Sequence, residues 1–366
     1  MAVKLTRRAF AGGGAAVAAN VGVLGLPAFA ACAPEGPRLA LRGVSLAGAE
    51  FGARMPGTHG KDYVYPGAAD INAVARLGFN SVRLPFRWER LVPELSAAFN
   101  GNEWRRLAET INLAEGAGLR VVLDVHNYAG RKVAADGFSA EHKIGSRLVP
   151  AATFVDFWGV LAARCKAWPN LVLGLMNEPF GIEPEAWLSI ANGAIARMRS
   201  TGSRHLVLVP GVAYTGAHSW HASGNTAMAG IRDPRDNFAI EVHQYLDADS
   251  SGTRADVVSA TVGPERIAAF QDWARGRGLR AYLGEFGAGS DGLGRTAVIN
   301  LVAELERNRD VWIGWAAWGA GPWWPRDYIF RIGGDGAPNL YTQTLSELAR
   351  GTALCEAPHE RGAKGN

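Results

Sequence analysis

Cysteine is scarce in this sequence, with only 3 among 366 residues. A chain with so few thiols is not a disulfide scaffold, so bridges cannot brace its loops as a framework. Cys165 and Cys355 can pair in an oxidising compartment, but the sequence gives no distance between them. With 48% hydrophobic and 20% charged residues, the composition describes an ordinary folded globular protein.

Two features of common binding proteins are also missing. The formal net charge is only +4, and no dense run of Lys and Arg interleaved with aromatic residues occurs, which argues against nucleic acid as a partner. Glycine-rich phosphate-binding motifs are missing as well, because residues 12–14 lie in the N-terminal segment and Gly333-Gly334 does not join a strand to a helix. An open dinucleotide-binding fold is therefore disfavoured, and we expect no cofactor.

The N-terminal segment lacks the long uninterrupted hydrophobic run of a membrane anchor. Residues 9–30 are small, apolar and uncharged, but Gly, Asn and Pro interrupt them, so a stable membrane span is not predicted. Arg7-Arg8 precedes this stretch, and Ala28-Phe29-Ala30 fits a cleavage site. We predict an export signal over residues 1–30, of twin-arginine or ordinary secretory type, with lipoprotein processing at Cys32 as an alternative. The mature protein is expected in the periplasm or outside the cell.

After a short linker at residues 31–38, strand and helix patterns alternate. Eight short runs rich in β-branched and apolar residues predict strands. They cover residues 41–46, 81–84, 120–125, 172–176, 206–209, 238–242, 280–283 and 311–315. Amphipathic stretches predict helices at residues 70–77, 103–117, 153–167, 185–200, 264–276, 296–308 and 342–350. Eight such units favour an α/β fold of a single (β/α)8 TIM barrel over residues 39–354, with a tail at 355–366. The crossover at residues 211–237 is the least regular and predicts only a weak helix.

Chemically useful side chains stand where these strands end. In a (β/α)8 barrel the functional groups gather at the C-terminal ends of the strands. Glu178 follows the fourth predicted strand and Glu285 follows the seventh, so the barrel places them across its mouth from one another. Other candidates at strand ends are Arg83, His126, Asn127, Asn177, His243, Tyr245 and Trp318.

A facing pair of glutamates fits the cleavage of a glycosidic bond. One carboxylic acid protonates the leaving oxygen, and in retaining enzymes a second carboxylate attacks the anomeric carbon, the two carboxyl groups lying about 5–5.5 Å apart. A single Glu at a strand end is more often a solvated carboxylate. Two of them, in Asn177-Glu178-Pro179 and Gly284-Glu285-Phe286-Gly287, favour catalysis.

These motifs also carry a family resemblance. The sequence resembles glycoside hydrolase family 5, the cellulase family of retaining (β/α)8 enzymes, and within it the endo-β-1,4-glucanase branch of fungi and some bacteria. The resemblance covers residues 40–350 in family order. Its further motifs are Gly43-Val44-Ser45-Leu46-Ala47-Gly48, Val82-Arg83-Leu84-Pro85, Asp124-Val125-His126-Asn127-Tyr128, Val242-His243-Gln244-Tyr245-Leu246-Asp247, Ser250-Ser251-Gly252-Thr253 and Trp318-Gly319-Ala320-Gly321.

The resemblance implies roles for the site residues. Glu178 corresponds to the acid/base and Glu285 to the nucleophile. Arg83 is expected to hold Glu285 ionised, Tyr245 to hydrogen-bond the same carboxylate, and Asn177 to donate to the sugar 2-hydroxyl. The negative charge of Glu285 would keep Glu178 protonated until the glycosyl intermediate forms.

The remaining candidates are expected to bind or orient the substrate. His126 and His243 would bind sugar hydroxyls or steer the carboxylates, and Trp318 matches the family's sugar-stacking platform. The chain contains 12 Trp, which can line a cleft or simply fill the core. Weaker candidates for lining the cleft are Trp88, Trp220, Asn127, Trp323 and Trp324.

The predicted partner is a β-1,4-linked glucan, cut by a protein that is monomeric by default. Alternatives on the same scaffold are a mannanase, a xyloglucanase or a β-1,3-glucanase, and less favoured is a sugar-binding protein without activity. A metal-dependent hydrolase is least favoured, because His126 and His243 lack an accompanying His-x-His pair or acidic cluster. We therefore expect no catalytic metal.

Overall fold

The computed structural model describes residues 38–95, 97–135, 138–334 and 337–352. The predicted export signal, most of the linker, the C-terminal tail, Cys32 and Cys355 lie outside these residues, so the predictions about processing and about a Cys165–Cys355 pair stay predictions. Cys165 itself is fully buried, and burial raises the pKa of its thiol to about 12. No helix among the described residues is long and apolar enough to cross a membrane.

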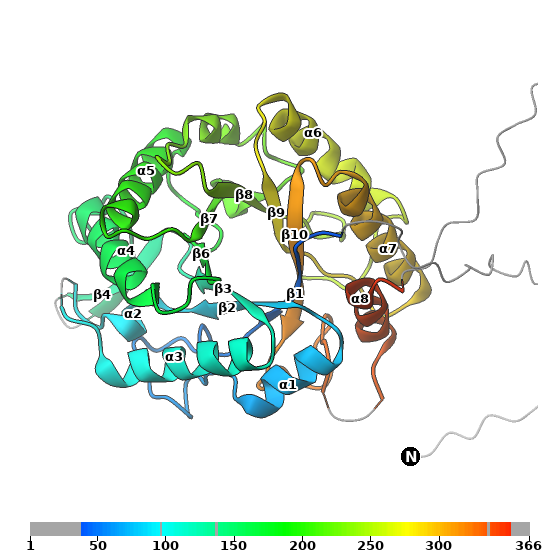
Figure 1. Ribbon diagram of the computed structural model, residues 1–366, viewed down its shortest axis with the longest axis horizontal. Coiled ribbons are helices and arrows are strands. Elements are labelled where there is room, and N and C mark those ends of the chain that lie inside the picture. Colours follow the sequence, from blue (N-terminus) through cyan, green and yellow to red (C-terminus); the bar gives the residue numbers. More distant parts are fainter. Residues whose placement is uncertain (1–37, 96, 136–137, 335–336, 353–366) are drawn as a thin grey trace, which may run out of the picture. The chain divides into compact units, whose positions relative to one another are not determined.

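The predicted (β/α)8 barrel is confirmed. Eight parallel strands close in the order β1-β10-β9-β8-β7-β6-β3-β2, and helices surround them (Figure 1). All eight strand predictions fall on barrel strands, although the last strand runs five residues further than predicted. The strands are β1 (Leu41–Leu46), β2 (Ser81–Phe86), β3 (Arg120–Val125), β6 (Val172–Gly174), β7 (Leu206–Pro210), β8 (Phe238–His243), β9 (Ala281–Glu285) and β10 (Trp312–Ala320).

The side chains on the inner face of the barrel change from apolar to charged along the barrel axis. Successive side chains of a strand point to opposite faces, so Val122 shares a face with Asp124 on β3, and Ala239 with Glu241 on β8. Val122 and Ala239 belong to a buried apolar cluster that is separate from the main core between strands and helices. Asp124 and Glu241, two residues further on, are also buried. The inner face therefore holds an apolar layer with ionisable groups above it, toward the C-terminal ends of the strands.

The helices match their predictions within a few residues, and recognisable caps explain several starts. The Asn100 side chain accepts from two backbone N–H groups at the start of α3, and the Asp291 and Asn339 side chains accept from one each at the starts of α7 and α8. The helices are α1 (Ala68–Arg76), α2 (Trp88–Leu91), α3 (Gly101–Gly116), α4 (Ala151–Cys165), α5 (Pro184–Ser200), α6 (Val262–Gly276), α7 (Gly292–Arg307) and α8 (Leu340–Arg350).

Three irregular pieces lie in the loops after the strands. The short helix α2 and the antiparallel hairpin of β4 (Gly130–Ala135) and β5 (Phe138–Lys143) were not predicted. The weak crossover at residues 211–237 contains only the 3-10 helices η1 (Ala213–Thr215) and η2 (Asn225–Gly230). Loops of this kind shape the mouth of a barrel, because all βα connections open on its C-terminal face.

The close approach of β1 and β10 predicts that a side chain at position 314 destabilises the protein. A Cβ on this residue would lie 2.3 Å from the Leu41 carbonyl oxygen and 2.5 Å from Leu41 Cβ, across the β1–β10 seam. We expect Gly314→Ala to lower the free energy of unfolding by about 1–3 kcal/mol, the usual cost of overpacking. Gly116→Ala, on the exposed side of α3 with no atom within 4 Å, is the matched control. Thermal unfolding of both variants measures the difference, and equal midpoints would contradict this account of the seam.

Candidate active site

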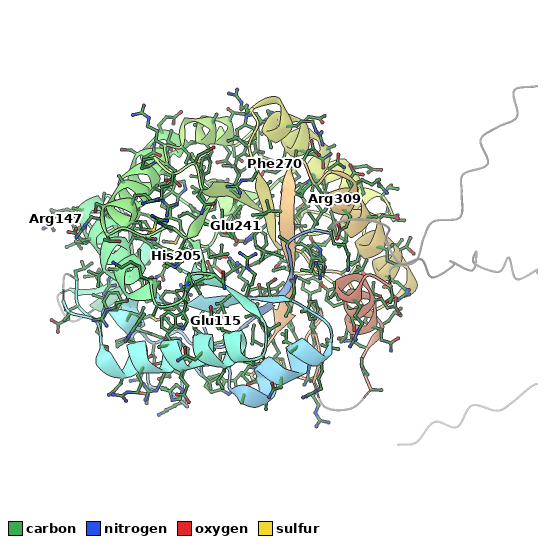
Figure 2. The ribbon with its side chains drawn as sticks, in the orientation of Figure 1. Glu115, Arg147, His205, Glu241, Phe270 and Arg309 are labelled. Carbon is green, nitrogen blue, oxygen red and sulfur yellow. The ribbon has the colours of Figure 1, made fainter. Side chains whose placement is uncertain are left out.

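Arg83 is the centre of a charged cluster inside the barrel mouth. It is fully buried, and its nitrogens lie 2.9 Å from Glu285 Oε1, 3.2 Å from Glu241 Oε1 and 3.2 Å from Asp124 Oδ2. Its Nη2 also donates to Asn177 Oδ1 at 2.7 Å. Burial lowers the pKa of Arg83, but the three carboxylates together raise it well above its ordinary value. Arg83 is thus a permanent cation that orients side chains from four other strand ends; Figure 2 shows Glu241 inside the ring of strands.

Glu285, the last residue of β9, is held through both carboxylate oxygens. Arg83 donates to Oε1, and the Tyr245 hydroxyl donates to Oε2 at 2.8 Å. Burial raises the pKa of Glu285, while the positive charges of His243 and Arg83 lower it, and the net shift is upward. The expected attraction from Arg83 is therefore present, but burial outweighs it. Burial also raises the pKa of Tyr245 well above its ordinary value, so the phenol keeps the proton that it donates.

Glu178 faces Glu285 from the end of β6. Its backbone is left-handed, with φ of 42°, a conformation that is costly for a residue with a Cβ and tends to occur at functional sites. Its side chain remains 16% exposed, whereas that of Glu285 is 6% exposed. Oxygens of the two carboxylates lie within 4.8 Å of one another. A pair of oxygens this close agrees better with the about 5–5.5 Å between the carboxyl groups of retaining glycosidases than with the about 6.5–9.5 Å of inverting ones.

His243 lies between the two glutamates. Its Nδ1 is 2.7 Å from Glu178 Oε1 and 3.6 Å from Glu285 Oε2, and its Nε2 is 3.5 Å from Glu241 Oε1. Burial lowers the pKa of His243, but the three carboxylates raise it to about 10. The ring is therefore an imidazolium at neutral pH, and its Nδ1 proton is directed at Glu178.

His126 has the opposite protonation state. Burial and the charge of Arg83 lower its pKa to about 3, so the ring is neutral. Its Nδ1 lies 2.8 Å from Asp124 Oδ2 and its Nε2 lies 3.2 Å from the Tyr128 hydroxyl. In the tautomer whose Nδ1 donates to Asp124, Nε2 accepts from the Tyr128 hydroxyl. The ring also stacks on Trp318, with centroids 5.8 Å apart and planes at 20°.

An aromatic group extends from Trp318 on the β10 side of the mouth. Trp318 is half-buried, and its indole N–H donates to the Tyr328 hydroxyl at 2.8 Å. Tyr328 stacks on Trp324 with centroids 3.9 Å apart. This cluster fixes the orientation of Trp318, as expected of a platform for a flat apolar ligand face.

A cavity of about 720 Å³ opens beside Glu178, and the residues of this aromatic group do not line it. Loops after β3, β6, β7 and β8 surround it, and its size suits a small ligand. Its lining residues are Tyr128, Glu178, Ala213, Tyr214, Gly216, His218, Ser219, Ser223, His243, Tyr245, Asp249, Ser250 and Ser251.

Three of the weaker candidates do not line the cleft, which corrects the prediction. Trp88 and Trp220 are 1% and 0% exposed; Trp88 packs on Phe154 and Phe157, and Trp220 packs on Phe270 of α6. Asn127 accepts from the Trp88 backbone N–H and donates to Glu89, so its amide is used within the protein. These three side chains therefore stabilise the protein itself. For the two Trp, filling the core is the alternative that the sequence left open.

Several site residues were not assigned a role from the sequence. Asp124 and Glu241 occur in the strand-end motifs, but only the closed barrel shows that both contact Arg83. Tyr128, next to His126 and Asn127, carries a left-handed φ of 53° and lines the cavity. Their position immediately before or after predicted strand ends is the signal that could have identified them.

Glu178, His243 and Glu285 also resemble a metal-binding group, since each offers one ligand atom within 4.8 Å of the others. A histidine binds a metal through a neutral imidazole. Because the pKa of His243 is raised to about 10, its nitrogens carry protons at neutral pH. With both nitrogens protonated, His243 is a hydrogen-bond donor to the neighbouring carboxylates.

The chain is similar along most of its length to known cellulases and endo-β-1,4-glucanases. Residues 38–321 match the family model described as cellulase, glycosyl hydrolase family 5. Endo-β-1,4-glucanase B of Emericella nidulans is 35% identical over 84% of this chain and 89% of its own length. An endo-β-1,4-glucanase structure from Xanthomonas axonopodis pv. citri is 41% identical, with a TM-score of 0.80 over 86% of this chain and all of that one. XacCel5A in complex with cellopentaose is 39% identical, with a TM-score of 0.79 over 85% of this chain and 99% of that one.

The raised pKa of His243 predicts a pH-dependent stability. Its pKa rises from 6.5 to about 10 on folding, so its contribution is complete below pH 6.5 and is lost as the pH rises through about 10. We expect the free energy of unfolding to fall across this window. His243→Asn should show a shallower fall, measured by chemical denaturation between pH 6.5 and 10. Parallel pH profiles of the two proteins would show that His243 is not the group responsible.

Proposed function

The chain belongs to glycosyl hydrolase family 5, and from this premise we propose that it is a retaining endo-β-1,4-glucanase with Glu178 as acid/base and Glu285 as nucleophile. The observation that carries the proposal is the facing carboxylate pair, whose oxygens lie within 4.8 Å of one another. The two groups have different surroundings, as their two roles require. Glu285 is buried between Arg83 and Tyr245, whereas Glu178 is more exposed and bonded to His243.

In the first step, Glu285 attacks the anomeric carbon while Glu178 protonates the glycosidic oxygen. The C–O bond to the leaving chain breaks, a glycosyl–Glu285 ester forms, and the proton leaves with the new hydroxyl. The proton comes from the pair of Glu178 and His243, whose Oε1 and Nδ1 are 2.7 Å apart. The pair thus supplies an acid next to the bond that is cleaved.

In the second step, Glu178 acts as a base. It takes a proton from water as the water oxygen attacks the ester carbon, which restores the Glu285 carboxylate and releases the sugar with its original configuration. Arg83 and Tyr245 stabilise the departing carboxylate because each donates to one of its oxygens, at 2.9 Å and 2.8 Å. The same two bonds make Glu285 a good leaving group.

Two side chains of the site, Asn177 and Trp318, are suited to contact the substrate. Asn177 Nδ2 is buried without an acceptor among the described residues, while its Oδ1 is fixed by Arg83. This amide is suited to donate to the sugar 2-hydroxyl near the anomeric carbon. Trp318 supplies the stacking face for the sugar under attack, and His126 fixes the Trp318 ring by stacking on it.

The proposed substrate is a β-1,4-glucan, and the support is the naming of the relatives as endo-β-1,4-glucanases together with the cellopentaose complex of a structural neighbour. Export is proposed from the basic, apolar and cleavable pattern of residues 1–30. We propose a monomer that acts outside the cytoplasm.

Substitution of the two glutamates tests their roles. We expect Glu178→Gln and Glu285→Gln each to lower kcat/KM on carboxymethyl cellulose by at least about 100-fold, the contribution typical of a general acid or base. Glu185→Gln, exposed at the start of α5, is the matched control and should keep wild-type activity.

Azide separates the acid from the nucleophile. With an activated aryl cellobioside, Glu178→Ala should be rescued by azide and give the β-glycosyl azide, because the ester still forms on Glu285. Glu285→Ala should not give that β product. Full activity of either glutamine variant would show that the glutamate has another role.

A panel of glycans tests the substrate. We expect hydrolysis of carboxymethyl cellulose to exceed that of β-mannan, xyloglucan and laminarin at equal mass concentration, measured as reducing ends. Preference for another glycan would leave the double displacement intact and overturn the substrate assignment.

A further inference from the structure

Glu241 is a buried carboxylate that neither chemical step uses directly. It lies on β8 two residues before His243, so the two side chains point to the same face of the sheet. Glu241 is 1% exposed, and its Oε1 lies 3.2 Å from Arg83 Nε and 3.5 Å from His243 Nε2. The other ring nitrogen, Nδ1, lies 2.7 Å from Glu178 Oε1. One nitrogen of His243 therefore faces the acid/base, and the other faces Glu241.

An irregularity in the pairing of β8 with β9 makes room for this arrangement. His243 pairs with Glu285 while the residue before it pairs with Leu283, so Gly284 is an extra residue in β9. An extra residue of this kind re-aims the side chains around it, and here it places Glu285 opposite His243. A Cβ on Gly284 would lie 2.2 Å from Glu241 Oε1 and 2.9 Å from His243 Nε2. The glycine before the nucleophile thus leaves the space in which Glu241 and His243 meet.

Glu241 and His243 carry opposite charges. Burial raises the pKa of Glu241, but Arg83 and His243 lower it, and the net shift is downward, so the group is a carboxylate. The pKa of His243 is raised to about 10 against the effect of burial, by Glu285, Glu178 and Glu241. The other titratable or charged groups that face Glu241 are Arg83, Asp124 and the neutral Tyr282.

Neutralising Arg83 does not by itself account for Glu241. The guanidinium is also paired with Glu285 and Asp124, at 2.9 and 3.2 Å. His243 Nε2 is buried and has no hydrogen-bond partner among the described residues, so its positive charge is stabilised there by the ion pair with Glu241. A buried cation without such a partner is costly. The carboxylate behind the ring therefore makes the charge on His243 possible.

The acid step needs a proton on the pair of Glu178 and His243, and it fails once the pair has lost that proton. We propose that Glu241 is a positioning residue that keeps His243 protonated and directed at Glu178, and thereby sets the alkaline limit of glycosidic-bond cleavage. A carboxylate behind a histidine acts in this way in other active sites, where it fixes the ring and stabilises the imidazolium. This inference rests on the proposed function.

The test compares a leaving group that must be protonated with one that need not be. The sugar released from cellopentaose leaves as an alcohol, whereas the phenolate of 2,4-dinitrophenyl β-cellobioside is stable without a proton. For both substrates kcat/KM reports the steps up to the glycosyl–Glu285 ester. Glu241→Gln retains the size of the side chain and removes its charge, and Glu241→Asp retains the charge. Asp124→Asn is the matched control, because it removes another carboxylate of Arg83 that is not paired with His243.

On cellopentaose, we expect Glu241→Gln to move the alkaline limb of the pH profile of kcat/KM down by about one pH unit or more, the usual effect of one nearby charge. Glu241→Asp should move it less, and Asp124→Asn by less than about 0.3 units. On the dinitrophenyl substrate, Glu241→Gln should stay within about threefold of wild type over the same pH range, because no acid is needed.

NMR of protein labelled with ¹⁵N in histidine gives a second readout that does not depend on activity. The His243 signal, identified by its loss in His243→Asn, should titrate at lower pH in Glu241→Gln than in wild type, where the pKa is about 10. An unchanged titration of His243 in the folded variant would overturn the proposal.

The kinetic outcomes are also decisive. An equal loss on both substrates at every pH would show that Glu241 only supports the structure, and an unmoved alkaline limb on cellopentaose would likewise overturn the proposal. If Glu241→Gln does not fold, Glu241→Asp decides: a smaller shift in the same direction supports the role, and no shift overturns it. Failure of the wild type to cleave either substrate would instead overturn the proposed function, and this inference with it.

Discussion

The buried ion cluster around Arg83 is the constraint on which the rest of the site depends. A guanidinium taken out of water loses hydration worth several kcal/mol, so its position is acceptable only with close opposite charges. Asp124, Glu241 and Glu285 provide them at 2.9–3.2 Å, from three different strands. The closed barrel is what brings these strands around one cation. The closure of the barrel therefore also sets the geometry of the carboxylates around Arg83.

The charges of this cluster also give the two histidines of the site, His243 and His126, different protonation states. His243 is charged because it lies among carboxylates, whereas His126 is neutral because burial and the charge of Arg83 both oppose a second cation there. The two histidines follow strands in similar sequence settings. Their difference arises from distances to Arg83 and to the glutamates, and it gives one of them a proton to share with Glu178 and the other an acceptor nitrogen for Tyr128.

The two sides of the mouth have separate aromatic surfaces. Trp318, Trp324 and Tyr328 lie on the β10 side, and Phe180 and Tyr214 lie on the side of Glu178. The first surface is fixed by side-chain hydrogen bonding and stacking, the second by a strained backbone turn. Specificity and catalysis are in this way carried by loops on a rigid scaffold, as is usual for the fold.

The sequence by itself determined the barrel and the strand-end residues, because buried parallel strands are short continuous apolar runs and the residues after them must share one face. It therefore predicted that Arg83, Glu178, Glu285, His243 and Trp318 lie together at the mouth of the barrel. It could not decide that Trp88 and Trp220 are buried, since a large aromatic ring suits a core and a cleft equally well. Nor could it reveal the pairing of Phe180 with Tyr214, or the charge of His243. Those depend on distances between residues far apart in the chain, which only the tertiary structure sets.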